Sequence, residues 1–256
     1  MSCVPLILNH KFMSENYQSY ANWKKWSWCD YEKVPQWMRR YFAGEVSRLN
    51  LPSNSRILEI GFGQGEFMEW ARAKGYKVCG LEIIDELVDK AKAAGFEAAM
   101  YNITSDQEGQ LSSQPTFLEA GGFDVIIAFD VVEHLTAEEF QAFLRFSKQM
   151  LAAKGSILLR FPNGGSPFGL RLQHGDNTHR MTLTETQLTQ MTVGGAFEVV
   201  FCGNAYRVVG DGKCSWLARL AFLFRNMIER FVGLVYFMRR IPLDPALTAI
   251  LKHQKI

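Results

Sequence analysis

The stretch Arg56-Ile-Leu-Glu-Ile-Gly-Phe-Gly-Gln-Gly65 decides the fold of this chain. Its first five residues are typical of a buried strand, and a helical pattern begins directly after the stretch, at about Glu66. Gly61, Gly63 and Gly65 stand between the two. Glycines at such a turn let the backbone pass close to a ligand, and they leave the first N–H groups of the helix free to face it. The stretch therefore predicts a strand, a turn and a helix with a ligand over the turn.

The same alternation continues on the C-terminal side of this unit. Short apolar runs predict strands at 77–81, 97–101, 124–129, 156–161, 197–201 and 247–251. Amphipathic patterns between them predict helices at 85–94, 137–151 and 184–192. Continuous apolar strands that alternate with helices are typical of a parallel sheet covered on both faces. We therefore expect an α/β fold of the doubly wound, Rossmann-like kind.

Composition is consistent with a single α/β domain. The chain has 256 residues, of which 48% are hydrophobic and 21% charged, as in ordinary globular proteins. The net charge of +2 gives no indication of a nucleic-acid partner. Five scattered cysteines without a C-x-x-C pair argue against a disulfide framework or a zinc site. They are Cys3, Cys29, Cys79, Cys202 and Cys214. Together with an N-terminus too polar for a signal peptide, this usage predicts a cytoplasmic protein.

The chain divides into two parts by pattern. Residues 1–50 are rich in tryptophan, tyrosine and charge, and they predict a helical N-terminal extension. The aromatic side chains of this extension either cover one edge of the sheet or form a lid over a ligand. Residues 51–256 form the main domain, which includes an amphipathic segment at 214–240.

Glu82 follows the second predicted strand, 21 positions after Gly61. A carboxylate at this position is suited to accept both hydroxyls of an adenosine ribose. A dinucleotide site would have a third glycine within the helix, where this chain has Glu66. A carboxylate in the first helical turn repels a pyrophosphate but tolerates a ligand without phosphate, such as S-adenosylmethionine. Glu59 adds negative character near the positively charged methionine end of that ligand.

These features resemble the class I S-adenosylmethionine-dependent methyltransferases over about residues 55–201. The resemblance rests on Ile57-Leu-Glu-Ile-Gly-Phe-Gly-Gln-Gly65, on Glu82 and on Phe123-Asp-Val-Ile-Ile-Ala-Phe-Asp-Val-Val-Glu-His-Leu135. It implies seven strands, the last of them antiparallel, and S-adenosylmethionine as the cofactor. It also implies a role for each of several residues: Gly61, Gly63 and Gly65 under the methionine part, Glu82 on the ribose, Asn102 near the adenine and Asp130 beside the methionine part.

The residues after the fourth predicted strand favour a hydroxyl as the methyl acceptor. Enzymes that methylate bases usually carry Asn or Asp, two prolines and an aromatic residue there, whereas this chain has Asp130-Val-Val-Glu133. Transfer to an aliphatic hydroxyl benefits from a general base. His134, His174 and His179 are the candidates by position, and Asp176 is a candidate partner of a histidine.

Two of these histidines lie in the long polar loop 171–179, which is unusual unless it is functional. The loop resembles one in bacterial methyltransferases that are encoded among surface-polysaccharide genes. The alternatives are a purely structural loop and a metal site formed by His174, Asp176 and His179. We assign no metal ligand among these residues.

The segment 215–240 predicts a long amphipathic helix before the last strand. Arg219, Asn226, Arg230 and Gly233 mark a narrow polar face, and all of its charges except Glu229 are arginines. Such a helix either lies in a membrane interface, with arginine at anionic headgroups, or packs its apolar face on protein. We expect membrane contact.

The sequence thus predicts O-methylation of a hydroxyl on a polysaccharide or lipid-linked sugar, at the inner face of the cytoplasmic membrane. One alternative is a methyltransferase of quinone, other lipid or small-molecule biosynthesis. A second alternative, of another class, is a cofactor- or membrane-binding module without catalysis.

Overall fold

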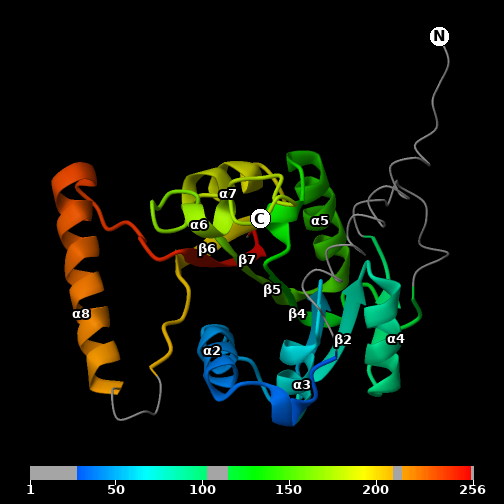
Figure 1. Ribbon diagram of the computed structural model, residues 1–256. Helices are drawn as coiled ribbons and strands as arrows, with labels where there is room; N and C mark the ends of the chain where they lie inside the picture. Colours follow the sequence, from blue (N-terminus) through cyan, green and yellow to red (C-terminus); the bar gives the residue numbers. More distant parts are fainter. Residues whose placement is uncertain (1–27, 103–114, 210–214, 255–256) are drawn as a thin grey trace.

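The computed structural model describes residues 28–102, 115–209 and 215–254 (Figure 1). Within these residues seven strands form one sheet in the order β3-β2-β1-β4-β5-β7-β6. The strands are β1 Arg56–Ile60, β2 Lys77–Glu82, β3 Glu97–Met100, β4 Phe123–Phe129, β5 Leu151–Pro162, β6 Phe197–Asn204 and β7 Ala246–His253. The β7 strand runs antiparallel to β5 and β6, and the other neighbours are parallel. The expected seven-stranded sheet with an antiparallel last strand is confirmed.

Helices cover both faces of this sheet (Figure 1). The α-helices of the described residues are α2 Gln36–Ser47, α3 Glu66–Ala73, α4 Asp85–Ala93, α5 Ala137–Met150, α6 Leu170–Gln173, α7 Glu185–Thr192 and α8 Ser215–Val232, of which α8 does not cover the sheet. Alternate residues of β4 point to opposite faces. Ile126 packs in a core with Phe143 of α5 and Leu188 of α7. Ile127 packs in a second core with Phe42 of α2 and Phe67 of α3. Burial on both faces explains the continuous apolar strands.

The fifth strand begins earlier than the sequence predicts. A capping box at Thr136 and Glu139 starts α5, and the helix ends at Met150. The next residue, Leu151, already pairs with Phe123 of β4, and the register shifts between Phe123 and Val125. Residues 151–155 therefore belong to β5 and not to a loop, because the chain passes directly from the helix into the sheet.

The described part of the N-terminal extension packs against the main domain. It contains a short 3-10 helix, Tyr31–Lys33, and then α2. Tyr41, Phe42 and Val46 of α2 are buried in the core shared with α3, and Trp37, Tyr41 and Phe42 also line the cavity described below. The aromatic residues Tyr17, Tyr20, Trp23 and Trp26 lie outside the described residues.

The α8 helix stands apart from the sheet at one end of the molecule (Figure 1). It is shorter than the sequence predicts, because it ends at Val232 and a π-helical turn, Gly233–Phe237, follows it. No residue of α8 is buried. In the described parts of the chain, no helix is both long enough and apolar enough to cross a membrane.

Candidate active site

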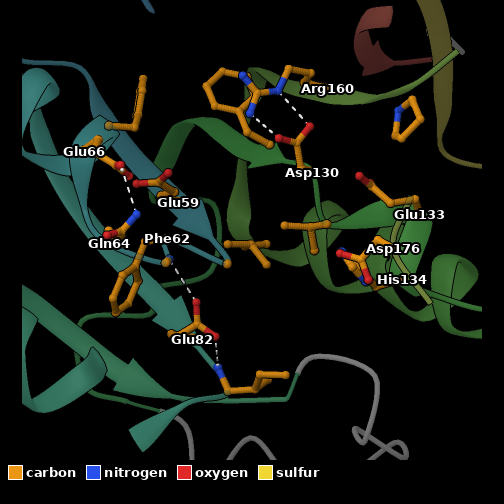
Figure 2. Close-up of a pocket in the computed structure, with 18 of the residues that line it drawn as sticks. Glu59, Phe62, Gln64, Glu66, Glu82, Asp130, Glu133, His134, Arg160 and Asp176 are labelled. Carbon is orange, nitrogen blue, oxygen red and sulfur yellow. Dashed lines mark hydrogen bonds and ion pairs between the residues drawn. The ribbon is translucent and has the colours of Figure 1, made fainter. Parts of the chain in front are cut away.

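A cavity of about 690 Å³ lies at the carboxyl ends of β1, β2, β4 and β5. The strand order reverses beside β1, and doubly wound sheets bind their ligands at such a point. The predicted site residues that line the cavity are Glu59, Gly61, Gly63, Glu82, Asn102, Asp130, His134, Asp176 and His179. Glu59, Gln64 and Glu66 gather on one side of it, and Glu133, His134 and Asp176 gather on the other (Figure 2). The cavity thus has two chemically different ends.

The glycine turn between β1 and α3 requires glycine at each position. Gly61, Gly63 and Gly65 have φ values of 70°, 52° and 77°, which side chains rarely adopt. A Cβ atom on Gly61 would also lie only 2.6 Å from Cγ2 of Val131. Gly65 is the N-cap of α3 and does not itself line the cavity. The turn therefore passes close to the cavity, as the sequence predicts.

The buried carboxylate of Glu82 holds this turn in place. Its Oε2 accepts the N–H of Gly63 at 3.0 Å, and its Oε1 accepts the N–H groups of Ile83 at 2.8 Å and Ile84 at 3.3 Å. Burial raises the pKa of Glu82, and these three N–H donors oppose that rise. A carboxylate has about four lone-pair sites. Glu82 therefore has capacity for a ribose hydroxyl while it orders the turn.

Glu59, at the end of β1, is 4% exposed, and its Oε2 has no hydrogen-bond partner. Burial and the neighbouring carboxylates of Glu66 and Glu82 raise the pKa of Glu59 well above its usual range. A buried carboxylate oxygen without a donor is costly, and a positively charged ligand supplies what it lacks. The ammonium and sulfonium of S-adenosylmethionine have this charge. The site therefore fits the cofactor that the resemblance implies.

Asp130 lies at the rim of the cavity, directly after β4. Its backbone adopts a left-handed conformation with φ of 56°. Arg160 of β5 holds its carboxylate by two hydrogen bonds, one of them from Nε to Oδ1 at 2.8 Å (Figure 2). The β4–β5 register places Phe129 opposite Arg160, which brings the two charged side chains together. Sequence reasoning missed Arg160, because an arginine inside an apolar strand shows no partner until the register is known.

At the opposite end of the cavity, a hydrogen-bond chain orients His134. Asp176 Oδ1 accepts the hydroxyl of Thr178 at 2.6 Å. Nδ1 of His134 lies 3.0 Å from that hydroxyl oxygen and 3.3 Å from the carbonyl oxygen of Thr178. The carbonyl only accepts, so Nδ1 carries the proton and Nε2 of the neutral ring carries the lone pair. Burial and the nearby His179 lower the pKa of His134, which favours this neutral form.

His179 and Glu133 meet beside His134. The Nδ1–H of His179 donates to the carbonyl oxygen of Gln173 at 2.9 Å, and its Nε2 lies 4.0 Å from Oε1 of Glu133. Glu133 is 1% exposed, and its Oε2 has no hydrogen-bond partner. Burial raises the pKa of Glu133 well above its usual range. Three side chains with acceptor atoms therefore converge at this end of the cavity.

The structure separates the sequence candidates into two groups. His134, Asp176 and His179 line the cavity, whereas His174 is exposed and lies outside the lining. From the sequence we considered a metal site formed by His174, Asp176 and His179. Among the described residues, the fold instead brings together Glu133, His134 and His179. Sequence reasoning also missed Glu133 as a site residue, although it directly precedes His134 in the quoted motif.

The fold and site are those of a class I S-adenosylmethionine-dependent methyltransferase. Strand order, glycine turn, acidic residue after β2 and a cavity at the strand ends all agree with this class. The chain belongs to the methyltransferase domain family, whose model matches residues 35–200. It is thus an enzyme that uses S-adenosylmethionine. No curated protein matches its sequence.

Solved structures share the fold at low sequence identity. A SAM-dependent methyltransferase from Archaeoglobus fulgidus is 19% identical, with a TM-score of 0.58, over 84% of this chain and 94% of that chain. A TehB-like SAM-dependent methyltransferase from Corynebacterium glutamicum is 15% identical, with a TM-score of 0.53, over 84% and 88% of the two chains. Another, from Clostridium acetobutylicum, is 10% identical, with a TM-score of 0.54, over 87% and 92%.

Proposed function

We propose that this methyltransferase O-methylates a hydroxyl of a polysaccharide or lipid-linked sugar. The observation that carries the hydroxyl acceptor is the convergence of Glu133, His134 and His179 at the end of the cavity opposite the glycine turn. A hydroxyl must lose its proton during methyl transfer, and each of these side chains offers a proton-accepting atom. Positioned acid–base groups typically contribute about 10²–10⁴ in rate.

Different residues of this chain have different roles in methyl transfer. When bound, S-adenosylmethionine supplies a methyl carbon whose bond to sulfur breaks, leaving the electron pair on sulfur, as the acceptor oxygen bonds to that carbon. Glu59 presents an unpartnered carboxyl oxygen to the positively charged methionine end of the cofactor, which would stabilise its ionised form. The hydroxyl proton passes to an imidazole Nε2, and the Nδ1 bonds to Thr178 and Gln173 hold the two rings in the accepting tautomer.

The outer face of α8 supports a lipid-linked acceptor. Trp216, Phe224, Met227 and Phe231 are 56–66% exposed, and further apolar side chains of α8 surround them. An exposed apolar surface of this extent is typical of a protein or membrane interaction site. The charged side chains that face the molecule are instead satisfied: Glu229 bonds Arg207 at 3.0 Å. The helix is therefore attached through polar contacts and presents its apolar residues outward, the reverse of an ordinary surface helix.

The charge of this segment favours a membrane as the partner. Arg219, Arg230, Arg239 and Arg240 are exposed, and basic residues near an anionic bilayer each contribute about 1 kcal/mol. Trp216 and Tyr236, 60% and 74% exposed, are side chains of the kind found at membrane interfaces. We therefore propose that α8 lies on anionic lipid and brings the cavity to an acceptor held there.

Labelled cofactor tests this proposal. The protein is incubated with methyl-labelled S-adenosylmethionine and lipid extract from the source cell on anionic vesicles, and the labelled product is isolated. We expect an alkali-stable methyl ether on a sugar that remains attached to lipid. Label on a quinone ring, an amine or a carboxyl ester would contradict the proposal. The His179→Ala variant, assayed in parallel, should lose turnover about 10²-fold or more while its cofactor affinity is unchanged.

A further inference from the structure

We propose that Glu133, His134 and His179 form a binding site for a divalent transition-metal ion at the acceptor end of the cavity. One ligand atom from each residue lies within 4.8 Å of the others. Two imidazole nitrogens and one carboxylate oxygen are a donor set that catalytic zinc and non-haem iron sites use, with coordination positions left open.

The two histidines are already oriented as metal ligands. Each ring bonds a backbone carbonyl oxygen through Nδ1, that of Thr178 for His134 and that of Gln173 for His179. Metal-binding histidines usually make such a bond with the nitrogen that does not touch the metal, and it fixes both tautomer and ring orientation. In both rings Nε2 is then the nitrogen that can act as the ligand atom, and the two rings meet at a centroid distance of 4.8 Å.

Glu133 provides a second, independent indication of a bound cation. It is 1% exposed, and its Oε2 lacks any hydrogen-bond donor. Its backbone carbonyl oxygen accepts the N–H groups of Arg180 at 2.8 Å and Met181 at 3.0 Å, which secures the loop carrying His179 beside it. The backbone thus holds ligands from two distant segments together, whereas Oε2 of the carboxylate lacks a hydrogen-bond donor. A cation bound here would contact the Glu133 carboxylate and one nitrogen of each ring.

The donor set selects the kind of ion. Calcium and magnesium prefer six or more oxygen ligands, whereas imidazole suits zinc, copper, iron and nickel. The role of the ion rests on the proposed O-methylation: a hydroxyl bound at an open position becomes more acidic. In the metal-loaded site the ring nitrogens are occupied, so the hydroxyl proton leaves to solvent water as the oxygen bonds to the methyl carbon.

The test measures metal binding separately from activity. Metal-free protein without a histidine tag is titrated with Co²⁺, which gives a visible absorption band when bound by nitrogen and oxygen ligands, and Zn²⁺ is then added as a competitor. We expect one Co²⁺ per chain, displaced by Zn²⁺ and not by Ca²⁺. Glu133→Gln and His179→Gln should each weaken Co²⁺ binding about 100-fold or more, because loss of an outer-shell partner alone costs about 10–100-fold. His253→Ala, at the end of β7, is the matched control and should bind Co²⁺ normally.

Melting curves show whether a variant has lost only a metal-binding side chain or has also lost its folded structure. Glu133→Gln replaces a buried carboxyl group, one oxygen of which is unpartnered, by an amide of the same size. The metal-free variant should therefore melt no lower than the unmutated protein, yet Zn²⁺ should no longer raise its melting temperature. Absence of the Co²⁺ band, or Co²⁺ binding by both site variants as tight as that of the unmutated protein, would overturn the inference. Full methyl transfer in the presence of a chelator would overturn the metal inference alone, and Co²⁺ binding without methylation of any sugar would overturn the proposed function alone.

Discussion

The buried carboxylate of Glu59 makes a sharp prediction, because Glu59→Gln should have opposite effects on stability and on cofactor affinity. The side chain is 4% exposed, with one oxygen unpartnered, and the carboxylates of Glu66 and Glu82 are nearby. An amide removes the charge, and its NH₂ group would lie in the field of those two carboxylates. Relief of an unsatisfied buried group is worth about 1–3 kcal/mol. At about 2–4 °C per kcal/mol for a chain of this size, the ligand-free protein should melt several degrees higher.

The stability that Glu59→Gln adds should depend on pH in a defined direction. Burial raises the pKa of Glu59 in the folded state above its unfolded value of about 4.3. Between these two pKa values the folded chain binds more protons than the unfolded chain, so stability falls as pH rises, by at most about 1.4 kcal/mol per pH unit. An amide does not titrate. The variant and the unmutated protein should therefore be equally stable below about pH 4, and the variant should be the more stable above it.

Affinity should change in the opposite direction. A hydrogen bond or ion pair to a charged group contributes about 1.5–3 kcal/mol, so the variant should bind S-adenosylmethionine about 10- to 150-fold more weakly. Calorimetric titration of the cofactor, run beside melting curves from pH 4 to pH 8, measures both effects. An unchanged cofactor affinity, or a melting temperature that falls at neutral pH, would refute the assignment of Glu59 to the positively charged end of the cofactor.

Three further variants test other parts of the structure. Gly61→Ala should lower cofactor affinity about tenfold, because a left-handed side chain costs about 1–2 kcal/mol and its Cβ meets Val131; adding Val131→Ala should restore only part of the affinity in calorimetry. Replacing Phe224 and Phe231 by Ser should abolish flotation with anionic vesicles and leave the melting temperature within about 2 °C, since both are exposed; a marked loss of stability would indicate packing on protein. Glu229→Ala should speed proteolysis of α8 without changing cofactor affinity, because Glu229 bonds Asn204, Arg207 and Leu243; equal cleavage rates would argue against this attachment.

The sequence by itself determined the features that depend on neighbours along the chain. The three glycines predicted the turn, because a positive φ is a local property that glycine tolerates best. The apolar runs predicted a sheet covered on both faces, because burial of a strand is visible in its own residues. Glu82 was identified for the same reason, since one helix and one strand separate it from the turn. The class of cofactor and the class of enzyme followed from these elements.

Only the tertiary structure decided which distant side chains meet. His179 was selected over His174 because the N–H groups of Arg180 and Met181 bond the carbonyl oxygen of Glu133, which draws the loop onto the end of β4. Arg160 was paired with Asp130 by strand register. The orientation of α8 was likewise undetermined by the sequence. A helix with polar residues on one side and apolar residues on the other can place its apolar side either on the protein or away from it. Arg207, Asn204 and Asp244 lie in segments outside α8. They bond Asn226, Glu229 and Arg225 respectively, and these contacts set which side of the helix faces the molecule. The sequence spacing contains no information on these pairings, because each depends on a contact between segments that only the folded chain brings together.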